Sequence, residues 1–332
     1  MNADAGKYNL LQKLYLFIHR RTFEKRLAKQ VQFRDKYILS VGNLSAGGTG
    51  KTPLTMYIAK KIIRKKPMVV LRGYGGAAKS SLLVCDGKKV LSNYKLAGDE
   101  AMLYAQVKGL RVAVAKKRKD AIEQFAVDSG IVFLDDAFQN PSVFRNHDLV
   151  LIDATIPPSD VKVFPTGLFR EDLSALHRAD TVLLTRTDQI SASELKEWKK
   201  VLSGYKKNTE VFESAHKVSR IRPALKSRTV GAFCGIGNSE SFFRSVEIMG
   251  YQIHQKKAWP DHHSYSLKDL DSLIAWNLPL VTTAKDAVRI QDLEEMLEKK
   301  LNLHILDIEV AIKNERQFLQ RIFRSASGKP TV

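Results

Sequence analysis

The sequence predicts an α/β protein with a mostly parallel sheet covered by helices on both faces, together with a second, smaller α/β domain. Continuous apolar runs that alternate with helical stretches are typical of strands buried in a parallel sheet. Ligands of such sheets bind at the carboxyl ends of the strands, so polar residues that end these runs are candidates for function. The runs are MVVL at 68–71, RVAVA at 111–115, IVFLD at 131–135, LVLID at 149–153 and TVLLT at 181–185.

A glycine-dense turn follows the β-rich segment at 37–41, and a helical pattern follows the turn. Strand, glycine loop and helix in this order are the context of a phosphate-binding P-loop, in which backbone N–H groups and the helix N-terminus face an anion. Lys51 would reach the β- and γ-phosphates, and the Thr52 hydroxyl would coordinate Mg²⁺. A glycine-rich surface turn is the alternative. The residues expected to bind nucleotide are Ser45, which stands at the usual first glycine, Ala46, Gly47, Gly48, Thr49, Gly50, Lys51 and Thr52.

Composition limits the partners and the compartment. The 332 residues suffice for two domains and carry a formal net charge of +19, which predicts an anionic partner: nucleic acid, anionic lipid or a phosphorylated substrate. Cys85 and Cys234 are far apart and lack metal-ligand spacing, which indicates a reducing compartment. No apolar run approaches the roughly 20 residues of a membrane span, and no signal pattern is visible, so we expect a soluble or peripheral protein.

Residues 8–29 predict an amphipathic basic helix, because their apolar side chains recur with the spacing of one helical face. Such a helix suits an interfacial membrane anchor, and the alternative is a helix packed on its own domain. The apolar stripe consists of Leu10, Leu11, Leu14, Phe17 and Ile18, and the basic residues that follow are Arg21, Lys25, Arg26 and Lys29.

Pairs of carboxylates lie at the boundaries of two predicted elements. Asp135 and Asp136 end a hydrophobic strand, which is the Walker B pattern whose carboxylate holds Mg²⁺ directly or through water, and a surface turn is the alternative. Asp99 and Glu100 lie at the apparent start of a helix, where the N-cap preference alone would explain Asp99.

Three other turn-forming segments carry polar residues. RGYGG at 72–76 would hold Arg72 and Tyr74 at the ligand edge of the sheet, or is a structural turn. FPTGLFRED at 164–172 contributes Arg170 and Glu171. TRTD at 185–188 lacks the Asn and Lys of the guanine-reading NKxD motif, so we interpret it as structural.

Adjacent histidines, His262 and His263, follow Asp261. No third or fourth ligand has the spacing of a metal site, so a general acid or base role, or the orientation of such a group, fits better. The alternative is a polar loop. The pattern of elements predicts a helix at 1–29, a P-loop kinase domain at 30–212, linking strands at 213–228 and a smaller domain at 229–332.

Taken together, these segments resemble the tetraacyldisaccharide 4′-kinase family, and they occur in the family's order between about residues 38 and 290. Ala137, Asn140 and Ala284 replace residues usual in the family, and the segment at 164–172 is looser than the family's pattern. The motifs that carry the resemblance are VGNLSAGGTGKTP, RGYGG, GDE, DDAFQN, FPTGLFRED, AFCGIGN, WPDHHSY and TTAKDAV.

The resemblance implies ATP-dependent, Mg²⁺-assisted phosphorylation of the 4′-hydroxyl of an acylated glucosamine disaccharide 1-phosphate in lipid A synthesis. It points to Asp99 as the base, tuned by a histidine of the DHH stretch, most simply His262, across an interdomain cleft, with Lys51 on the phosphates. The Mg²⁺ shell would come from Thr52, Glu100 and one or both of Asp135 and Asp136. Candidate substrate contacts are Arg72, Tyr74, Arg170, Glu171 and His263.

The same resemblance implies a peripheral protein on the cytoplasmic face of the inner membrane of a Gram-negative bacterium. Its partners would be the lipid substrate and an anionic membrane surface, with no nucleic acid and no obligate protein partner. A nucleic-acid-associated P-loop ATPase or switch GTPase is the alternative that the +19 charge suggests, although the chain lacks NKxD and an aromatic RNA-binding signature. A membrane-docking module without activity would leave Asp99 and the two histidines unexplained.

Overall fold

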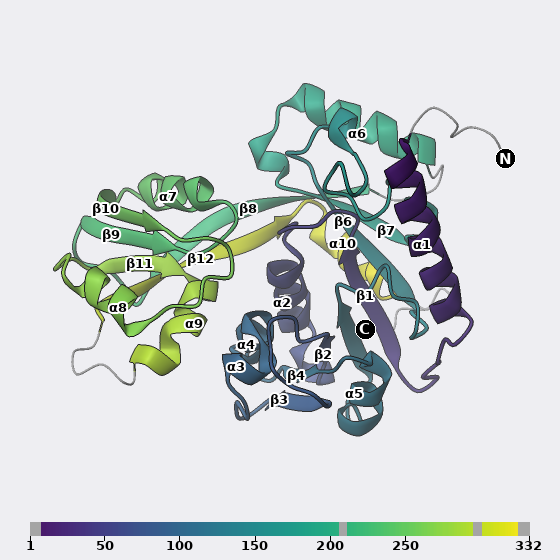
Figure 1. Cartoon of the computed structure of the whole chain (residues 1–332), viewed down its shortest axis with the longest axis horizontal. Coiled ribbons are helices and arrows are strands. Elements are labelled where there is room, and N and C mark those ends of the chain that lie inside the picture. The colour runs from purple at the N-terminus through teal and green to yellow at the C-terminus, as the bar shows by residue number, and fades with distance from the viewer. Residues whose placement is uncertain (1–7, 206–210, 295–300, 325–332) are drawn as a thin grey trace.

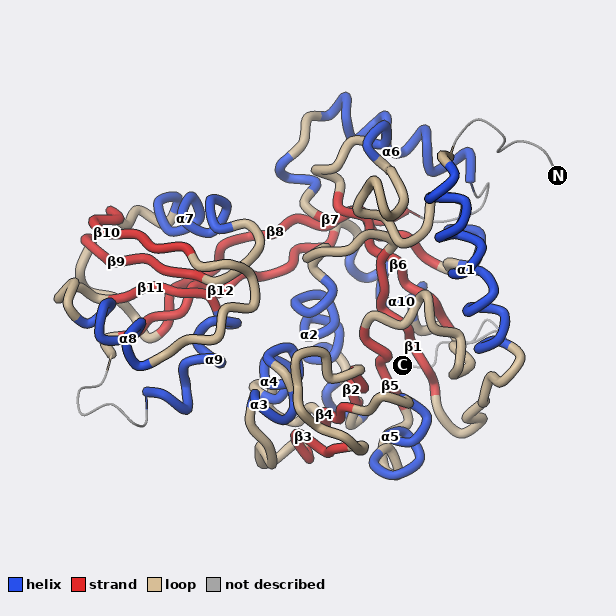
Figure 2. Tube along the Cα trace, viewed as in Figure 1, coloured by secondary structure: helices blue, strands red, loops and turns tan. Residues whose placement is uncertain are grey.

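The computed structural model describes residues 8–205, 211–294 and 301–324, and it has two lobes joined by two long strands (Figures 1 and 2). One sheet runs through both lobes, which confirms the predicted α/β fold with a mostly parallel sheet. In spatial order its 12 strands are β10 (Gln252–Ala258), β9 (Thr229–Cys234), β11 (Leu280–Thr283), β12 (Leu303–Ile312), β8 (Val211–Arg222), β7 (Thr181–Thr185), β6 (His147–Asp153), β1 (Tyr37–Asn43), β5 (Ile131–Asp135), β2 (Met68–Leu71), β4 (Arg111–Val114) and β3 (Leu82–Asp86).

Strand β1 is the centre of the larger lobe. It pairs in parallel with β5 on one side and with β6 on the other, and all 7 of its residues are buried. Because successive side chains of a strand point to opposite faces, Ile38 packs in one core while Leu39 and Val41 pack in another. Helices therefore cover both faces of the strand. The helices of this lobe are α1 (Leu10–Leu27), α2 (Lys51–Lys61), α3 (Tyr94–Ala97), α4 (Asp99–Ala105), α5 (Arg118–Phe125), α6 (Ala192–Tyr205), α10 (Glu315–Ile322) and the 3₁₀ turns η1 (Ile63–Lys65), η2 (Pro158–Asp160), η3 (Leu173–Arg178) and η4 (Thr187–Gln189).

The smaller lobe has its own two-sided core. Strands β10, β9, β11 and β12 are parallel, and α7 (Ser239–Ile248) lies on one face while α8 (Leu267–Ile274) and α9 (Ala284–Glu294) lie on the other (Figure 1). Phe242 and Phe243 of α7 fill the first core, and Leu270 and Leu273 of α8 fill the second.

Two expected domain boundaries differ from the structure. The expected linker, 213–228, belongs largely to one strand, β8, which starts beside β7 and then pairs antiparallel with β12. The expected smaller domain, 229–332, is wrong at its C-terminal end, because β12 leads back to the larger lobe. There Phe318 packs on Phe212 with ring centroids 5.3 Å apart, and the Tyr37 hydroxyl donates to the Ile322 carbonyl at 2.7 Å.

Helix α1 is docked on the larger lobe by polar contacts and by the partly buried Leu16, while a row of its other apolar side chains stays exposed. Gln12 is buried, and its Nε2 donates to the Thr166 hydroxyl at 2.6 Å and to the Val163 carbonyl at 3.2 Å. The Tyr15 hydroxyl donates to the Arg170 carbonyl at 3.1 Å.

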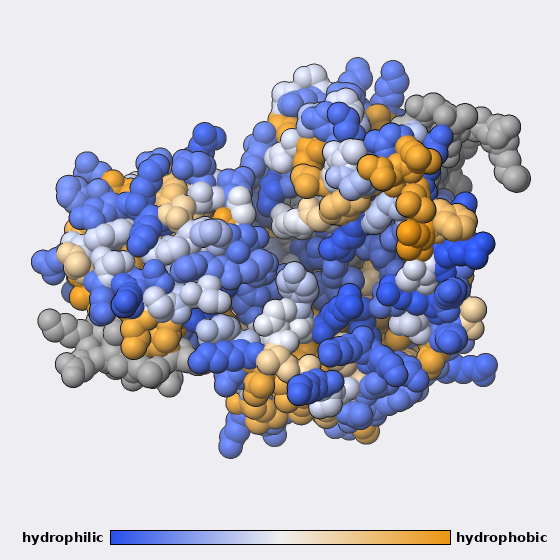
Figure 3. All heavy atoms as spheres, viewed as in Figure 1, coloured by the Kyte–Doolittle hydropathy of each residue, from blue (hydrophilic) through white to orange (hydrophobic). Residues whose placement is uncertain are grey.

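Apolar side chains form an exposed row along this helix (Figure 3). The row consists of Leu10 (81% exposed), Leu11 (61%), Leu14 (54%), Phe17 (55%) and Ile18 (56%). Among the described helices none combines the length and the apolar character needed to span a membrane.

The packing of α10 generates a stability prediction. Phe318 is fully buried in the core of the larger lobe, so Phe318→Ala should lower the free energy of unfolding of that lobe by about 3–5 kcal/mol. Denaturant unfolding followed by circular dichroism measures the change. Ile248→Ala, at a side chain that is 71% exposed, should stay within about 0.5 kcal/mol. Equal losses from the two variants would show that α10 does not pack on the larger lobe.

Candidate active site

The loop between β1 and α2 has the backbone of an anion-binding turn. Gly47 has a φ of 118°, and Gly50, the N-cap of α2, has a φ of 88°. Glycine adopts such values without the strain that a Cβ would cause. The loop leads directly into an 11-residue helix that begins at Lys51, and the positive end of the helix dipole favours a phosphate there.

The segment at 164–172 pairs with the start of this loop. The Ala46 N–H donates to the Leu168 carbonyl, and the Arg170 N–H donates to the Leu44 carbonyl, both at 2.7 Å. These contacts explain why Arg170 lies close to the P-loop although the two are far apart in sequence.

The TRTD segment supports the loop from another side. The Arg186 side chain donates through Nη2 to the Gly48 carbonyl at 2.6 Å and forms an ion pair with Asp153 at the end of β6. A Cβ added at Gly50 would lie 2.9 Å from Nε2 of His216, which comes from β8. The sequence favours a structural interpretation of this segment, and in the structure Arg186 contacts the P-loop itself.

Asp136 is held by two cations beside the P-loop. Its carboxylate lies 3.5 Å from Lys51 Nζ and accepts from Arg170 Nη1 at 2.9 and 3.0 Å. Burial raises the pKa of Asp136, but Lys51 and Arg170 more than offset this, so the pKa lies below its usual value. Asp136 is therefore ionised and is already committed to Lys51 and Arg170.

Asp135 is more buried than Asp136, and its pKa shifts in the opposite direction. It is 3% exposed, and its Oδ1 has no hydrogen-bond partner among the described residues. Burial raises its pKa to about 7, and the negative charge of Glu100 adds to this while Lys51 opposes it. A buried, unpaired carboxylate oxygen close to a second carboxylate favours a cation between them.

The side chains at this site can supply part of the coordination shell of Mg²⁺. Thr52 is buried at the start of α2, and it would add a hydroxyl oxygen to those of Asp135 and Glu100. Oxygen ligands suit Mg²⁺, which in phosphoryl-transfer sites takes few protein ligands and completes its shell with water and phosphate. No cluster of at least 3 His, Cys, Asp or Glu side chains able to hold a metal occurs in the described part of the chain.

Arg118 shapes the acidic turn, and our sequence analysis did not single it out. Its guanidinium is buried and donates through Nη2 to the carbonyls of Asp135, at 2.6 Å, and Asp136, at 3.0 Å. Asp136 has a φ of 48°, a left-handed value that these hydrogen bonds support. In the sequence, Arg118 lies in the basic run KKRK, which resembles an exposed charged face.

Asp99 lies where the two lobes meet. It is the first residue of α4, it is 7% exposed, and its Oδ1 accepts from the Glu100 N–H at 2.9 Å. Its Oδ2 lies 3.3 Å from His262 Nδ1 and accepts from Arg289 Nε at 2.9 Å and from Arg289 Nη2. Burial raises the pKa of Asp99, but Arg289, Lys285 and His262 together bring it below its usual value. The carboxylate is thus buried and ionised.

The two adjacent histidines have different surroundings. His262 has a left-handed φ of 60° and turns toward Asp99, with its ring centroid 6.2 Å from that of Tyr74. His263 stacks on Trp259 at 5.3 Å, and its Nε2 lies 3.3 Å from Asp269 Oδ2. The geometry therefore brings His262, and not His263, to Asp99.

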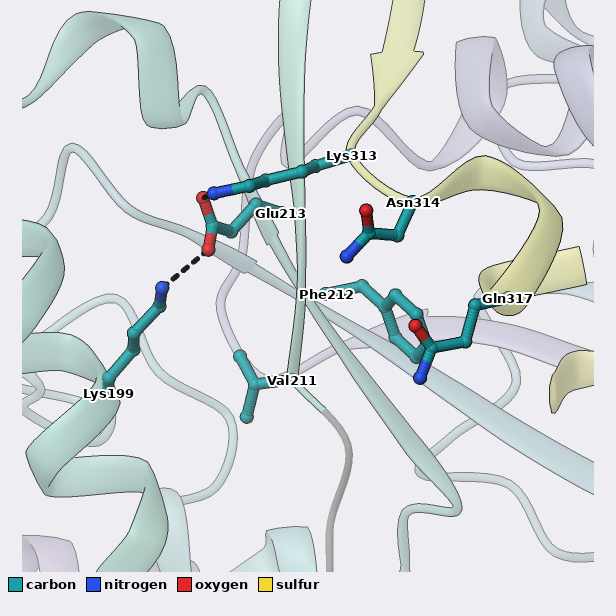
Figure 4. Close-up of a pocket in the computed structure, with 7 residues that line it drawn as sticks. All are labelled: Lys199, Val211, Phe212, Glu213, Lys313, Asn314 and Gln317. Carbon is teal, nitrogen blue, oxygen red and sulfur yellow. Dashed lines mark hydrogen bonds and ion pairs between the residues drawn. The ribbon is translucent and has the colours of Figure 1, made fainter.

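The remaining candidates are not gathered at one point. Arg72 is exposed just after β2, and Tyr74 is 78% exposed. Glu171 is buried and accepts two hydrogen bonds from Arg178 Nη2, at 2.7 and 2.8 Å. A cavity of about 320 Å³ lies elsewhere, and none of its lining residues belongs to the expected site (Figure 4). In that cavity Glu213 lies between Lys199, at 2.5 Å, and Lys313, at 3.5 Å.

The fold and the site together define a class. A P-loop that follows the central strand of a parallel sheet, with an acidic strand end beside it, is typical of P-loop nucleotide-binding proteins. The separate buried carboxylate Asp99 favours, within that class, a kinase that removes a proton from its acceptor.

Comparisons with known proteins identify the family. The family model described as tetraacyldisaccharide-1-P 4′-kinase matches residues 8–326, and the chain belongs to this family. A tetraacyldisaccharide 4′-kinase of Halothermothrix orenii is 32% identical over 95% of this chain and 91% of its own length. The one of Desulfotalea psychrophila is 36% identical over 76% of this chain and 78% of its own length.

A solved structure shares the fold. It is that of LpxK from Aquifex aeolicus, described as an "apo" form in complex with ATP, and it superposes with a TM-score of 0.75 at 24% identity over 95% of this chain and 96% of that one. The family resemblance and the kinase class predicted from sequence are confirmed, and the nucleic-acid-associated ATPase or GTPase is not favoured. The chain is accordingly a kinase of lipid A biosynthesis.

Lys51 provides the first test of the P-loop. Lys51→Ala should lower kcat for phosphoryl transfer by at least about 10²–10³-fold, because the ammonium would stabilise charge that develops in the transition state. Lys60→Ala, at an exposed lysine of the same helix, should leave the rate unchanged. Initial rates with radiolabelled ATP measure both. A folded Lys51→Ala protein with normal turnover would remove Lys51 from the site.

Proposed function

We propose that this protein transfers the γ-phosphoryl group of ATP to the 4′-hydroxyl of an acylated glucosamine disaccharide 1-phosphate, with Asp99 as the base. The observation that carries the proposal is the buried, ionised Asp99 carboxylate, which directly precedes Glu100 and meets His262 from the other lobe. The family to which the chain belongs supplies the chemical identity of the acceptor.

In this proposal the larger lobe holds the nucleotide. Backbone N–H groups of residues 47–52 would bind the phosphates, and Lys51 would contact the β- and γ-phosphates. Thr52, Glu100 and Asp135 would hold Mg²⁺, which when bound neutralises charge on the transferred group. Asp136 would hold the side chains of Lys51 and Arg170 in position, since both contact its carboxylate.

Asp99 would receive the proton of the acceptor hydroxyl. As the hydroxyl oxygen forms its bond to the γ-phosphorus, the bond from that phosphorus to the β–γ bridging oxygen breaks, and ADP leaves. His262 would stabilise the ionised Asp99 and fix its orientation. Burial raises the pKa of Asp99, but Arg289 and Lys285 lower it and so keep the carboxylate ionised, which is the form that can accept a proton.

The polar residues around Asp99 are proposed to meet the sugar and its phosphate. Tyr74 packs beside His262 and is largely exposed, so it can contact an acceptor that approaches Asp99. Arg72, two residues earlier, would bind an anionic group of that acceptor. We assign Glu171 and His263 supporting roles, because the Glu171 carboxylate already accepts from Arg178 and the His263 ring already stacks on Trp259.

We further propose that α1 places the enzyme on the cytoplasmic face of the inner membrane of a Gram-negative bacterium. The substrate is a lipid, so the enzyme must work at an interface. The exposed row of Leu10, Leu11, Leu14, Phe17 and Ile18 would enter the bilayer, each side chain contributing about 1.5–3 kcal/mol if fully buried. The nearby basic residues would contribute about 1 kcal/mol each close to anionic headgroups.

One experiment tests the function. Purified protein is incubated with labelled ATP, Mg²⁺ and the acylated disaccharide 1-phosphate, and the label in the lipid is followed by chromatography. We expect transfer to this acceptor and none to its 4′-deoxy analogue. Label in the 4′-deoxy compound, or hydrolysis stimulated by nucleic acid without transfer, would contradict the proposal.

The proposed contact of Asp99 with His262 is tested by a double-mutant cycle. Asp99→Asn should lower kcat by about 10²–10⁴-fold with little change in ATP affinity, because it removes the general base. His262→Ala should lower kcat less, since it acts through Asp99. The combined loss should be smaller than the product of the single losses. Full multiplicativity would show that the two residues act independently.

The membrane role of α1 is tested without disturbing its docking. Leu10, Leu14 and Phe17 are replaced together by Gln, which favours helix, while Gln12 and Tyr15 keep their contacts with the lobe. The variant should lose flotation with anionic vesicles and activity on bilayer substrate, and keep its activity on detergent-dispersed substrate. Val127→Gln and Ile248→Gln, at side chains 74% and 71% exposed, are the matched controls. Unchanged flotation of the triple variant would show that α1 is not the anchor.

A further inference from the structure

Arg289 is a buried cation at the contact between the lobes. It lies in α9 of the smaller lobe, it is 3% exposed, and α9 packs against α4 of the larger lobe. A buried charge is tolerated only where partners satisfy it. Arg289 has such partners in both lobes, so the contact between the lobes depends on its pairing.

One end of the guanidinium is fixed to the smaller lobe. Nη1 donates to the Gly235 carbonyl at 2.7 Å and to Asp286 Oδ1 at 3.2 Å. Asp286 is itself held by the Tyr265 hydroxyl at 2.9 Å and by the Thr283 hydroxyl at 2.6 Å. This network sets the position of the Arg289 side chain before any contact with the other lobe is considered.

The other end of the guanidinium is directed at Asp99. Nε donates to Asp99 Oδ2 at 2.9 Å, and Nη2 contacts the same oxygen and lies 3.3 Å from His262 Nδ1. Oδ2 is therefore surrounded by donors of the smaller lobe. Among the described residues, Oδ1 accepts one hydrogen bond, from the Glu100 N–H, and a carboxylate oxygen has a second lone pair for a further donor.

We propose that Arg289 is the positioning residue of the reaction: it holds Oδ2 of Asp99 so that Oδ1 faces the acceptor hydroxyl. This inference rests on the proposed role of Asp99 as the base. The base is then correctly oriented only while the lobes are in contact, whereas the P-loop binds ATP in either case, since no P-loop residue contacts Arg289 in the described structure.

Substitution of Arg289 by Lys and by Met tests the proposal, because neither side chain can make the two-pronged contact. Arg289→Met should lower kcat by about 10²-fold, the effect of a misplacement of about 1 Å, and Arg289→Lys should lower it by less. The KM for ATP should change less than about 3-fold, since binding at the P-loop is unaffected. The matched control is Arg145→Met, which removes a similar buried pair: Arg145 Nε and Nη2 contact Asp148 Oδ2 at 3.1 and 2.9 Å.

In an Asp99→Asn background, Arg289→Lys should cause no further loss of kcat. Full activity of folded Arg289→Lys and Arg289→Met proteins, an equal loss in Arg145→Met, or a multiplicative loss with Asp99→Asn would each overturn the inference. ATP binding serves as the check that each variant is folded. If Arg289→Met does not bind ATP, the test relies on Arg289→Lys and on its double-mutant cycle with Asp99→Asn. Failure of the unmodified protein to phosphorylate the disaccharide would instead refute the proposed function.

Discussion

The site depends on one buried ion pair between the lobes, that of Asp99 with Arg289. An ionised carboxylate that is 7% exposed requires cationic or donor partners, and among the described residues of the larger lobe only the Glu100 N–H donates to Asp99. Its other partners, Arg289 and His262, come from the smaller lobe. The electrostatic state of Asp99 and the relative position of the lobes therefore depend on each other. Strands β8 and β12 make this possible, because they connect the lobes through a continuous sheet.

The phosphate half of the site obeys a different constraint, that of strand order. The P-loop follows strand β1, and the neighbouring strand β5 ends at Asp135, which Asp136 follows, so the acidic pair lies near Lys51. The two acids then divide their tasks by environment. The charge of Asp136 is balanced by cations, whereas the buried Asp135 has one oxygen without a partner in the described part of the chain and a raised pKa that a divalent cation would lower.

The sequence predicts those parts of the site whose signal is local. The P-loop, the acidic strand end and the alternation of strands and helices each occupy a short stretch, and the sheet topology brings them together. The choice between His262 and His263 stayed open in the sequence, because it depends on the stacking of His263 on Trp259. Arg118 and Arg289 were missed for a related reason: each looks like an ordinary charged helix residue until the fold buries it against residues distant in sequence. The packing of α10 on the larger lobe likewise involves a contact with Tyr37, which is distant in sequence and cannot be predicted from a local pattern.

The meeting of α4 and α9 across the lobes is tested most directly by zero-length cross-linking with a carbodiimide. Lys285 Nζ lies 3.8 Å from Glu100 Oε1 in this contact, and Lys61 Nζ lies 2.6 Å from Glu315 Oε1 within the larger lobe, with both side chains accessible. Mass spectrometry of the digested protein should find an amide between Lys285 and Glu100 as well as the internal standard between Lys61 and Glu315. Glu100→Gln should remove the first cross-link and keep the second. Formation of the standard alone in the unmodified protein would contradict a site assembled from both lobes.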